Sequence, residues 1–167
     1  MMPCKAFHLH RNAVKGFSEA DEKHMLRALQ LARAAGEGGE VPVGAVLVRG
    51  DAVIGEGCNR PIGQNDPTAH AEMEAIRAAA TQIGNYRLEN STLYVSLEPC
   101  VMCAGAIVTA RIQRLVFAAR DLRFGAVRSK FQLADSELLN HRVVVQEGLF
   151  GAEAAEMMAG FFRVRRD

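Results

Sequence analysis

The spacing of apolar residues predicts a helix and then a hairpin in the first part of the chain. Ser18 and Asp21 have the spacing of a capping box, and apolar residues follow at helical intervals, so a first helix is predicted from Glu19 to Ala35. Glycines end this helix, and two short β-rich runs follow at 43–48 and 52–57. A short polar turn separates the two runs, which indicates a β-hairpin.

A loop and a second helix are predicted next. The segment from Asn59 to Thr68 is rich in proline and glycine, and the side chain of Thr68 can cap a following helix. His70 and Glu72 then fall in the first turn of that helix. Its apolar face comprises Ala71, Ala75, Ile76 and Ala79.

Three more strands and two more helices complete the pattern. β-branched and aromatic residues predict a strand from Thr92 to Leu97, and a helix is predicted from Cys100 to Arg111. Strands are predicted again at 115–118 and 142–146, with a short helical pattern around 130–139 between them. This connection is far longer than a hairpin needs, so the last two strands should be parallel. A helix from Ala152 to Arg166 closes an α/β pattern with five strands.

The length and composition indicate a single globular domain. With 167 residues, of which 49% are hydrophobic, the chain can bury a core without disulfides. We assign residues 18–167 to one domain and residues 1–17 to an N-terminal extension that we expect to be mobile. The sequence has no apolar run long enough for a membrane span and no apolar block typical of a secretory signal, so a cytoplasmic protein is expected.

Four residues at two predicted helix starts form a candidate catalytic zinc site. Cys100 and Cys103 are three positions apart, which places both sulfurs on one side of a helix start, where the helix dipole stabilises thiolates. His70 would add a nitrogen ligand and leave the fourth tetrahedral position open for water, as in catalytic zinc sites. Glu72 would then act as a general acid and base beside that water.

Other interpretations of the same residues are possible when each is taken alone. A Cys-x-x-Cys pair is often redox-active, or part of a structural zinc site for which Cys58 is the best candidate fourth ligand. His70 could be an ordinary helix-start histidine, and Glu72 a carboxylate favoured by the helix dipole. Together, however, the H-x-E and P-C-x-x-C motifs form the signature of zinc-dependent nucleobase deaminases. We therefore predict a hydrolytic deaminase with one zinc ion per subunit.

Segments outside the zinc motifs narrow the prediction to one family. The chain resembles the bacterial tRNA-specific adenosine deaminase (TadA) family from about Ser18 to Arg166. The resemblance is carried by the segments 39–48, 59–63, 66–72, 85–88, 97–106 and 161–166.

This resemblance implies the fold, the reaction and the partners. The expected fold is the three-layer α/β/α cytidine-deaminase-like fold around a five-stranded mixed sheet, in a homodimer. The expected reaction converts the wobble adenosine to inosine in the anticodon loop of a tRNA, specifically an arginine tRNA. Asn59 would hydrogen-bond the flipped base, and backbone groups at Ala71 and Leu97 would complete the pocket.

The tRNA contacts are expected in a loop where the chain departs from the family pattern. Residues 118–129 contain Arg123 in place of the usual lysine, and Phe124 and Arg128 are unusual. Basic side chains in this loop and near the C-terminus suit phosphate contacts. The candidate RNA contacts are Arg120, Asp121, Arg123, Arg128, Lys130, Arg163, Arg165 and Arg166.

Two alternative functions compete with tRNA editing. The first is a deaminase of a small molecule such as guanine, cytosine or a free nucleoside, to which these basic residues would bring no advantage. The second, from another class, is a non-catalytic RNA-binding module stabilised by zinc. A structural site has no use for a general base, so the presence of Glu72 argues against that module.

Overall fold

A capping box starts the first helix, α1 (Glu19–Glu37), as the sequence predicts. Ser18 Oγ accepts the Asp21 N–H at 3.1 Å, and Asp21 Oδ2 accepts the Ser18 N–H at 3.0 Å. The computed structural model of the protein describes residues 16–166, so all of the predicted N-terminal extension except Gly16 and Phe17 lies outside the described residues. Along residues 16–166, no helix is both long and apolar enough to cross a membrane.

Five strands form one mixed sheet in the order β2-β1-β3-β4-β5. β1 pairs antiparallel with β2 and with β3, whereas β3, β4 and β5 are parallel, which confirms the predicted mixed sheet and the parallel last pair. The strands are β1 (Gly44–Arg49), β2 (Ala52–Cys58), β3 (Ser91–Leu97), β4 (Arg114–Ala119) and β5 (Val144–Glu147).

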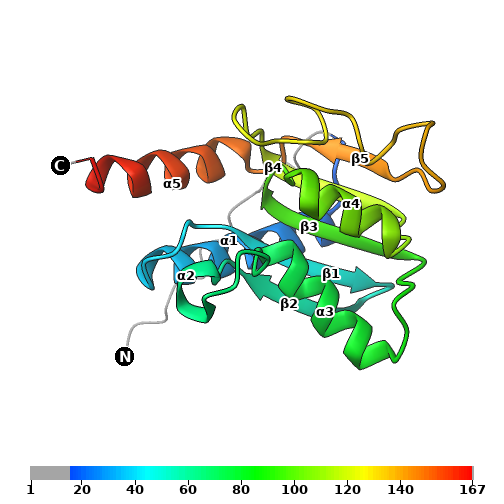
Figure 1. Ribbon diagram of the computed structural model, residues 1–167. Helices are drawn as coiled ribbons and strands as arrows, with labels where there is room; N and C mark the ends of the chain where they lie inside the picture. Colours follow the sequence, from blue (N-terminus) through cyan, green and yellow to red (C-terminus); the bar gives the residue numbers. More distant parts are fainter. Residues whose placement is uncertain (1–15, 167) are drawn as a thin grey trace, which may run out of the picture.

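Helices cover both faces of this sheet, as the three-layer fold requires (Figure 1). Alternate residues of a strand point to opposite faces, and in β1 Leu47 joins one hydrophobic cluster while Val46 joins the other. The first cluster contains residues of α3 (Ala71–Ile83) and α4 (Val101–Thr109). The second contains residues of α1 and α5 (Gly151–Val164).

Three sequence-based predictions of local structure are wrong. Residues 130–139 form turns rather than a helix, because their backbone bonds reach distant partners, such as Leu133 N–H to Ala126 O and Val143 N–H to Ala134 O. Thr68 does not cap α3, because its N–H and hydroxyl both bond to Asp66 Oδ1.

The third error is a short helix, α2 (Pro61–Gln64), within the segment predicted as a loop. A residue outside this helix accepts hydrogen bonds from its N-terminal amides: Glu40 accepts the N–H of Ile62 at 3.3 Å and that of Gly63 at 2.7 Å. The predicted ends of the last two long helices also shift, since α4 stops at Thr109 and α5 stops at Val164.

A buried ion pair joins the start of α1 to the sheet. The Asp21 carboxylate, 5% exposed, accepts bonds from Tyr94 Oη at 2.7 Å and from Arg114 at 2.7 and 3.0 Å. Burial alone would raise the pKa of Asp21, but the bonds from Arg114, Ser18 and Tyr94 outweigh it and hold this pKa well below its ordinary value. The capping residue of α1 is thus also a partner of β3 and β4.

β2 and α3 approach so closely that only glycine fits between them. A Cβ atom on Gly57 would lie 2.3 Å from the carbonyl oxygen of Ala71, and one on Gly55 would lie 2.3 Å from that of Ala75. Both separations are below van der Waals contact, so any side chain here would push α3 away from the sheet. These glycines therefore set the position of the first turn of α3, which carries Glu72.

We predict that Gly57→Ala lowers the free energy of unfolding by about 1–3 kcal/mol, the usual cost of overpacking. Gly105→Ala is the matched control, because a Cβ there meets no atom within 4 Å and lies in α4. That change should raise stability by up to about 1 kcal/mol through helix propensity. Urea unfolding of both variants checks this, and equal stabilities would contradict the close contact of β2 with α3.

Candidate metal centre and active-site pocket

His70, Cys100 and Cys103 meet at one point, as the sequence predicts. His70 Nδ1 lies 3.5 Å from Cys100 Sγ and 3.6 Å from Cys103 Sγ. Zn–S bonds of about 2.3 Å and Zn–N bonds of about 2.0–2.1 Å at tetrahedral angles give an S···N separation of about 3.6 Å. The donor set and its spacing therefore fit a zinc ion.

Two helix N-termini supply these ligands. His70 is the N-cap residue of α3 and Cys100 is that of α4, both with extended backbone, and Cys103 lies in the first turn of α4. The His70 side chain makes no capping bond to α3, and the Cys100 side chain bonds within α4 to Cys103, the other thiol of the cluster. The positive ends of the two helix dipoles also favour thiolate ligands here.

The thiol environment is suited to metal binding. The hydrogen bond from Cys103, followed by that from His70, lowers the pKa of Cys100 to about 4 despite burial. The hydrogen bond to Cys100 and burial raise the pKa of Cys103. The pair thus shares a proton that a coordinating cation would displace.

No fourth protein ligand belongs to this centre within residues 16–166. The only group of three or more His, Cys, Asp or Glu side chains with ligand atoms close together there is His70, Cys100 and Cys103, all within 4.8 Å. Cys58 is not part of it, so the closed structural site with Cys58 as fourth ligand is not formed. A three-ligand site leaves one tetrahedral position for water or substrate.

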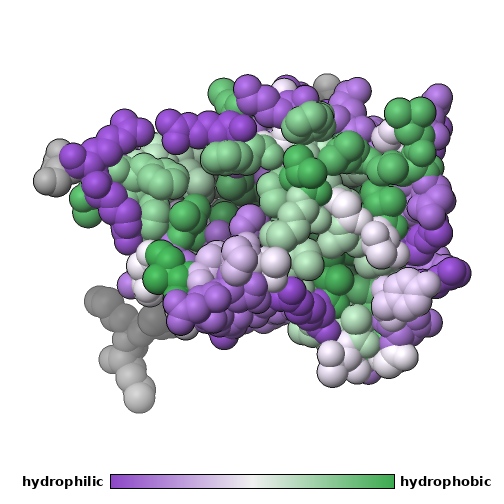
Figure 2. All heavy atoms as spheres, viewed as in Figure 1, coloured by the Kyte–Doolittle hydropathy of each residue, from purple (hydrophilic) through white to green (hydrophobic). Residues whose placement is uncertain are grey.

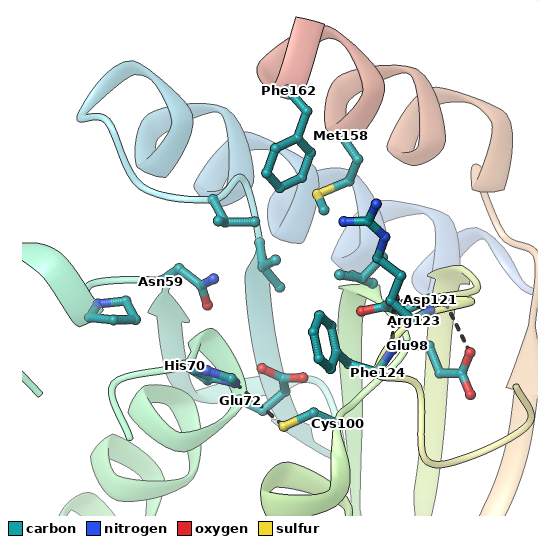
Figure 3. Close-up of a pocket in the computed structure, with 14 residues that line it drawn as sticks. Asn59, His70, Glu72, Glu98, Cys100, Asp121, Arg123, Phe124, Met158 and Phe162 are labelled. Carbon is teal, nitrogen blue, oxygen red and sulfur yellow. Dashed lines mark hydrogen bonds between the residues drawn. The ribbon is translucent and has the colours of Figure 1, made fainter. Parts of the chain in front are cut away.

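Glu72 lies beside this centre and points into the pocket (Figure 3). Its side chain comes from the first turn of α3 and is 3% exposed. Burial raises the pKa of Glu72 to about 7, although a backbone hydrogen bond and the nearby His70 favour its charged form. A carboxyl group with a pKa near neutrality can both take up and release a proton.

The centre lies within a cavity of about 550 Å³, in the range of about 300–1,000 Å³ typical of small-molecule sites. Met158 and Phe162 of α5 enter it from the side opposite His70 (Figure 3). The sequence analysis placed these two residues in the last predicted helix but not among the candidate site residues. The lining residues are Val41, Val43, Asn59, Pro61, His70, Glu72, Leu97, Glu98, Cys100, Asp121, Arg123, Phe124, Met158 and Phe162.

Asn59 is held by the start of α3. Its Oδ1 accepts the Ala71 N–H at 2.9 Å, and its own N–H bonds to Val43 O at 3.1 Å. The Ala71 amide therefore already has a partner, and Nδ2 is the part of the Asn59 amide left for the pocket. Leu97 also lines the pocket, at the end of β3.

Glu98 is a residue of the site that the sequence analysis missed. It is 2% exposed and accepts backbone N–H bonds from Asp121, Val127, Arg128 and Ser129. Burial would raise its pKa, but the Ser129 hydroxyl and these amides more than offset this and lower it. Its place beside the Pro99–Cys100 motif was the one available signal, because its bonding partners are distant in sequence.

Some of the predicted RNA-contact residues of the 120–130 loop line the pocket or are exposed, whereas others are held in ion pairs. Asp121 and Arg123 line the pocket, and Lys130 is exposed. Arg120 pairs with Glu147 at 2.7 Å, and Arg128 pairs with Asp135 at 2.9 Å.

The C-terminal arginines lie outside the pocket lining. Arg163 pairs with Glu156 at 2.6 Å. Arg165 stacks over the ring of Phe161 at 3.5 Å and bonds to Gly39 O at 3.4 Å. Arg166 is exposed beyond the end of α5.

Comparison with known proteins identifies the family. Residues 18–119 match the cytidine and deoxycytidylate deaminase zinc-binding region. The chain is 53% identical to the tRNA-specific adenosine deaminase of Haemophilus influenzae, over 93% of this chain and 91% of that one. A solved structure from work on A-to-I editing by tRNA deaminases at the wobble position superimposes with a TM-score of 0.78 at 47% identity, covering 81% of this chain and 98% of the other.

A more distant likeness exists to a guanine deaminase from Nitrosomonas europaea. Its TM-score is 0.74 at 26% identity, over 84% of this chain and 83% of the other. The fold is thus shared between deaminases with different substrates, and a guanine deaminase structure from Bacillus subtilis is 46% identical over 59% of this chain. The tRNA-specific relative of Haemophilus influenzae combines 53% identity with a match over 93% of this chain. The chain therefore belongs to the cytidine and deoxycytidylate deaminase zinc-binding family and, within it, to the tRNA-specific adenosine deaminases.

Proposed function

We propose that this protein hydrolytically deaminates adenosine at the wobble position of a tRNA anticodon loop to inosine, with an arginine tRNA as its substrate. The observation that carries the proposal is the three-ligand centre, open on one side, with Glu72 next to it in a pocket. The relative in Haemophilus influenzae, named a tRNA-specific adenosine deaminase, supports the substrate.

His70, Cys100 and Cys103 would hold one zinc ion per chain, which when bound supplies Lewis acidity that makes water a nucleophile at neutral pH. Glu72 takes the proton from the attacking water, which adds to C6 of the base. The same carboxyl group delivers this proton to N1, then takes the second proton from the hydroxyl added at C6 and gives it to the departing amine, so that ammonia leaves and inosine remains. Asn59 Nδ2 would donate to the base, since Oδ1 is held by Ala71.

The substrate adenosine must leave the base stack to reach this pocket. An anticodon loop already presents unpaired bases, so little energy is needed to extrude one. Arg123, exposed at the pocket edge, suits a loop phosphate, with Lys130 and Arg166 as further exposed cations. Arg120, Arg128, Arg163 and Arg165 would have to exchange their protein partners for RNA, which makes them weaker candidates.

We also infer that the protein acts as a homodimer. Apolar side chains gather over α4 and the β4–β5 connection on the face shown in Figure 2. Among the residues there, Val101 is 51%, Phe131 55% and Leu138 95% exposed. An exposed apolar area of this kind is typical of an interface with a second chain.

We predict that the purified protein holds about one zinc ion per chain and that Cys100→Ala or Cys103→Ala loses it on dialysis, because each removes one of three ligands. Cys58→Ala is the matched control and should retain zinc, since Cys58 lies outside the cluster. Metal analysis by mass spectrometry checks all three variants. Full activity without any metal would refute the mechanism.

Glu72→Gln should lower kcat by about 10²–10⁴-fold while zinc content and hairpin binding stay near those of the parent, because the residue moves protons and holds no metal. Glu74→Gln, on the same helix, is the control: its carboxylate pairs with Arg77 at 3.2 Å, and it should keep full activity. Activity, zinc and affinity are measured on the same preparations. If Glu72→Gln remains within tenfold of the parent, Glu72 is not the proton carrier.

We predict that an anticodon stem-loop with adenosine at the wobble position is deaminated far faster than free adenosine, guanine or cytidine. Contacts with flanking nucleotides orient the hairpin, and a free nucleoside lacks them. Steady-state rates on all four substrates in one buffer decide this. A better rate on guanine or a nucleoside would favour the small-molecule alternative.

The same hairpin tests the phosphate contact. Hairpin binding weakens as salt concentration rises, and the slope of log K against log salt concentration reports the number of phosphate contacts. Arg123→Ala should make this slope less steep by up to about 0.7, the value for one contact with a single-stranded phosphate. Arg142→Ala serves as the control, because its side chain is 61% exposed, pairs with Glu137 and lies outside the pocket lining.

A further inference from the structure

Glu98 is a buried carboxylate with no place in the deamination mechanism. It connects β3 to the Pro99–Cys100 segment and is 2% exposed. Figure 3 shows its carboxylate pointing away from Glu72 and toward the loop that follows β4. It is therefore unable to exchange protons with a base held above Glu72.

Five donors from one loop satisfy this carboxylate. Oε2 accepts the Asp121 N–H at 3.0 Å and the Ser129 hydroxyl. Oε1 accepts the backbone N–H groups of Val127 at 3.1 Å, Arg128 at 2.6 Å and Ser129 at 2.8 Å. The donors come from both ends of residues 121–129, so a single side chain ties the loop into a closed turn.

The loop also docks directly on the metal-ligand segment. Ala126 N–H bonds to Pro99 O at 2.8 Å, and Gly125 forms an isolated antiparallel bridge with Cys100. A Cβ on Gly125 would lie 2.4 Å from the Glu98 carboxyl carbon, so the loop backbone passes against the carboxylate itself. Glycine is the residue that this approach permits.

The other side of the loop faces the pocket. Asp121 Oδ1 accepts the N–H of Arg123 at 2.9 Å and that of Phe124 at 3.1 Å, which makes a tight turn directly after the Glu98 contact. Arg123 and Phe124 both line the pocket, and Phe124 is 68% exposed. A basic and an aromatic side chain together are what a single-stranded RNA loop recognises through phosphate and stacking contacts.

We propose that Glu98 is a positioning residue for the polynucleotide substrate, because its carboxylate fixes the loop that carries Arg123 and Phe124 to the pocket. This inference rests on the proposed function in naming RNA as the substrate. Asn59, His70 and Glu72, which surround the target base, come from other elements. Loss of Glu98 should therefore affect the flanking contacts more than the chemistry.

A single tryptophan can report on this loop, since the chain contains none. Phe124→Trp places one at the exposed turn, and all variants are compared in that background. Its fluorescence anisotropy without RNA measures the order of the loop. Zinc content and the melting temperature show whether the fold and the metal centre survive.

Glu98→Gln is the main variant, because its amide group points N–H donors at backbone N–H groups and leaves some of these without an acceptor. We expect lower anisotropy, about one zinc per chain, and a fall of about 10- to 100-fold in kcat/KM on the hairpin, mostly through KM. Ser129→Ala removes only one donor, so it should lower the anisotropy and raise KM by less than Glu98→Gln does. It keeps the test open if Glu98→Gln fails to fold.

Glu56→Gln is the matched control. Glu56 is a hydrogen-bonded carboxylate on β2, outside the 121–129 loop, and it accepts two bonds from Arg27 at 2.8 Å. It should leave anisotropy and KM unchanged. The proposal is overturned if Ser129→Ala and Glu98→Gln leave both the anisotropy and KM unchanged. It is also overturned if the anisotropy falls without any rise in KM, or if zinc is lost together with loop order. If the parent does not deaminate the hairpin, the proposed function fails. The role of Glu98 is then still decided by the loop anisotropy together with the affinity for the hairpin.

Discussion

The whole site depends on three strands that end at the same edge of the sheet. β2 and β3 are each antiparallel to β1 and hence parallel to one another, and β4 is parallel to β3. Their carboxyl ends therefore lead into the Asn59 segment, the Pro99–Cys100 junction and the 120–130 loop on one side of the molecule. Crevices at the carboxyl ends of parallel strands are where α/β proteins bind ligands.

Two buried glutamates lie on opposite sides of the Cys100 junction, and their different surroundings give them different pKa values. Glu72 is 3% exposed, and burial raises its pKa to about 7, which suits proton transfer. Glu98 is 2% exposed, but the Ser129 hydroxyl and the backbone amides of Arg128, Ser129 and Asp121 lower its pKa and keep it charged. Burial dominates at Glu72, whereas at Glu98 the donors facing the carboxylate outweigh it.

The same framework supports deaminases with other substrates, as the likeness to a guanine deaminase shows. What the zinc-binding framework provides is a ligand set and a proton carrier. We expect substrate choice to depend on the pocket lining outside this framework, where α5 contributes Phe162 and the 120–130 loop contributes Arg123 and Phe124. The loop part of this lining can change without disturbing the helix starts that carry His70, Cys100 and Cys103.

The sequence by itself predicted the strands and long helices from the pattern of apolar and β-branched residues. It also predicted the cluster of His70, Cys100 and Cys103 with Glu72 beside it, because these residues have a fixed local spacing at two helix starts. Only the tertiary structure decided the roles of Glu98 and Asp21, the helix α2 held by Glu40, and the turns at 130–139. In each of these cases the bonding partners lie many residues away, as with Glu98 and Ser129 or Asp21 and Arg114. Periodicity records which face of an element is apolar, but it carries no information about which distant backbone amide a buried carboxylate will meet.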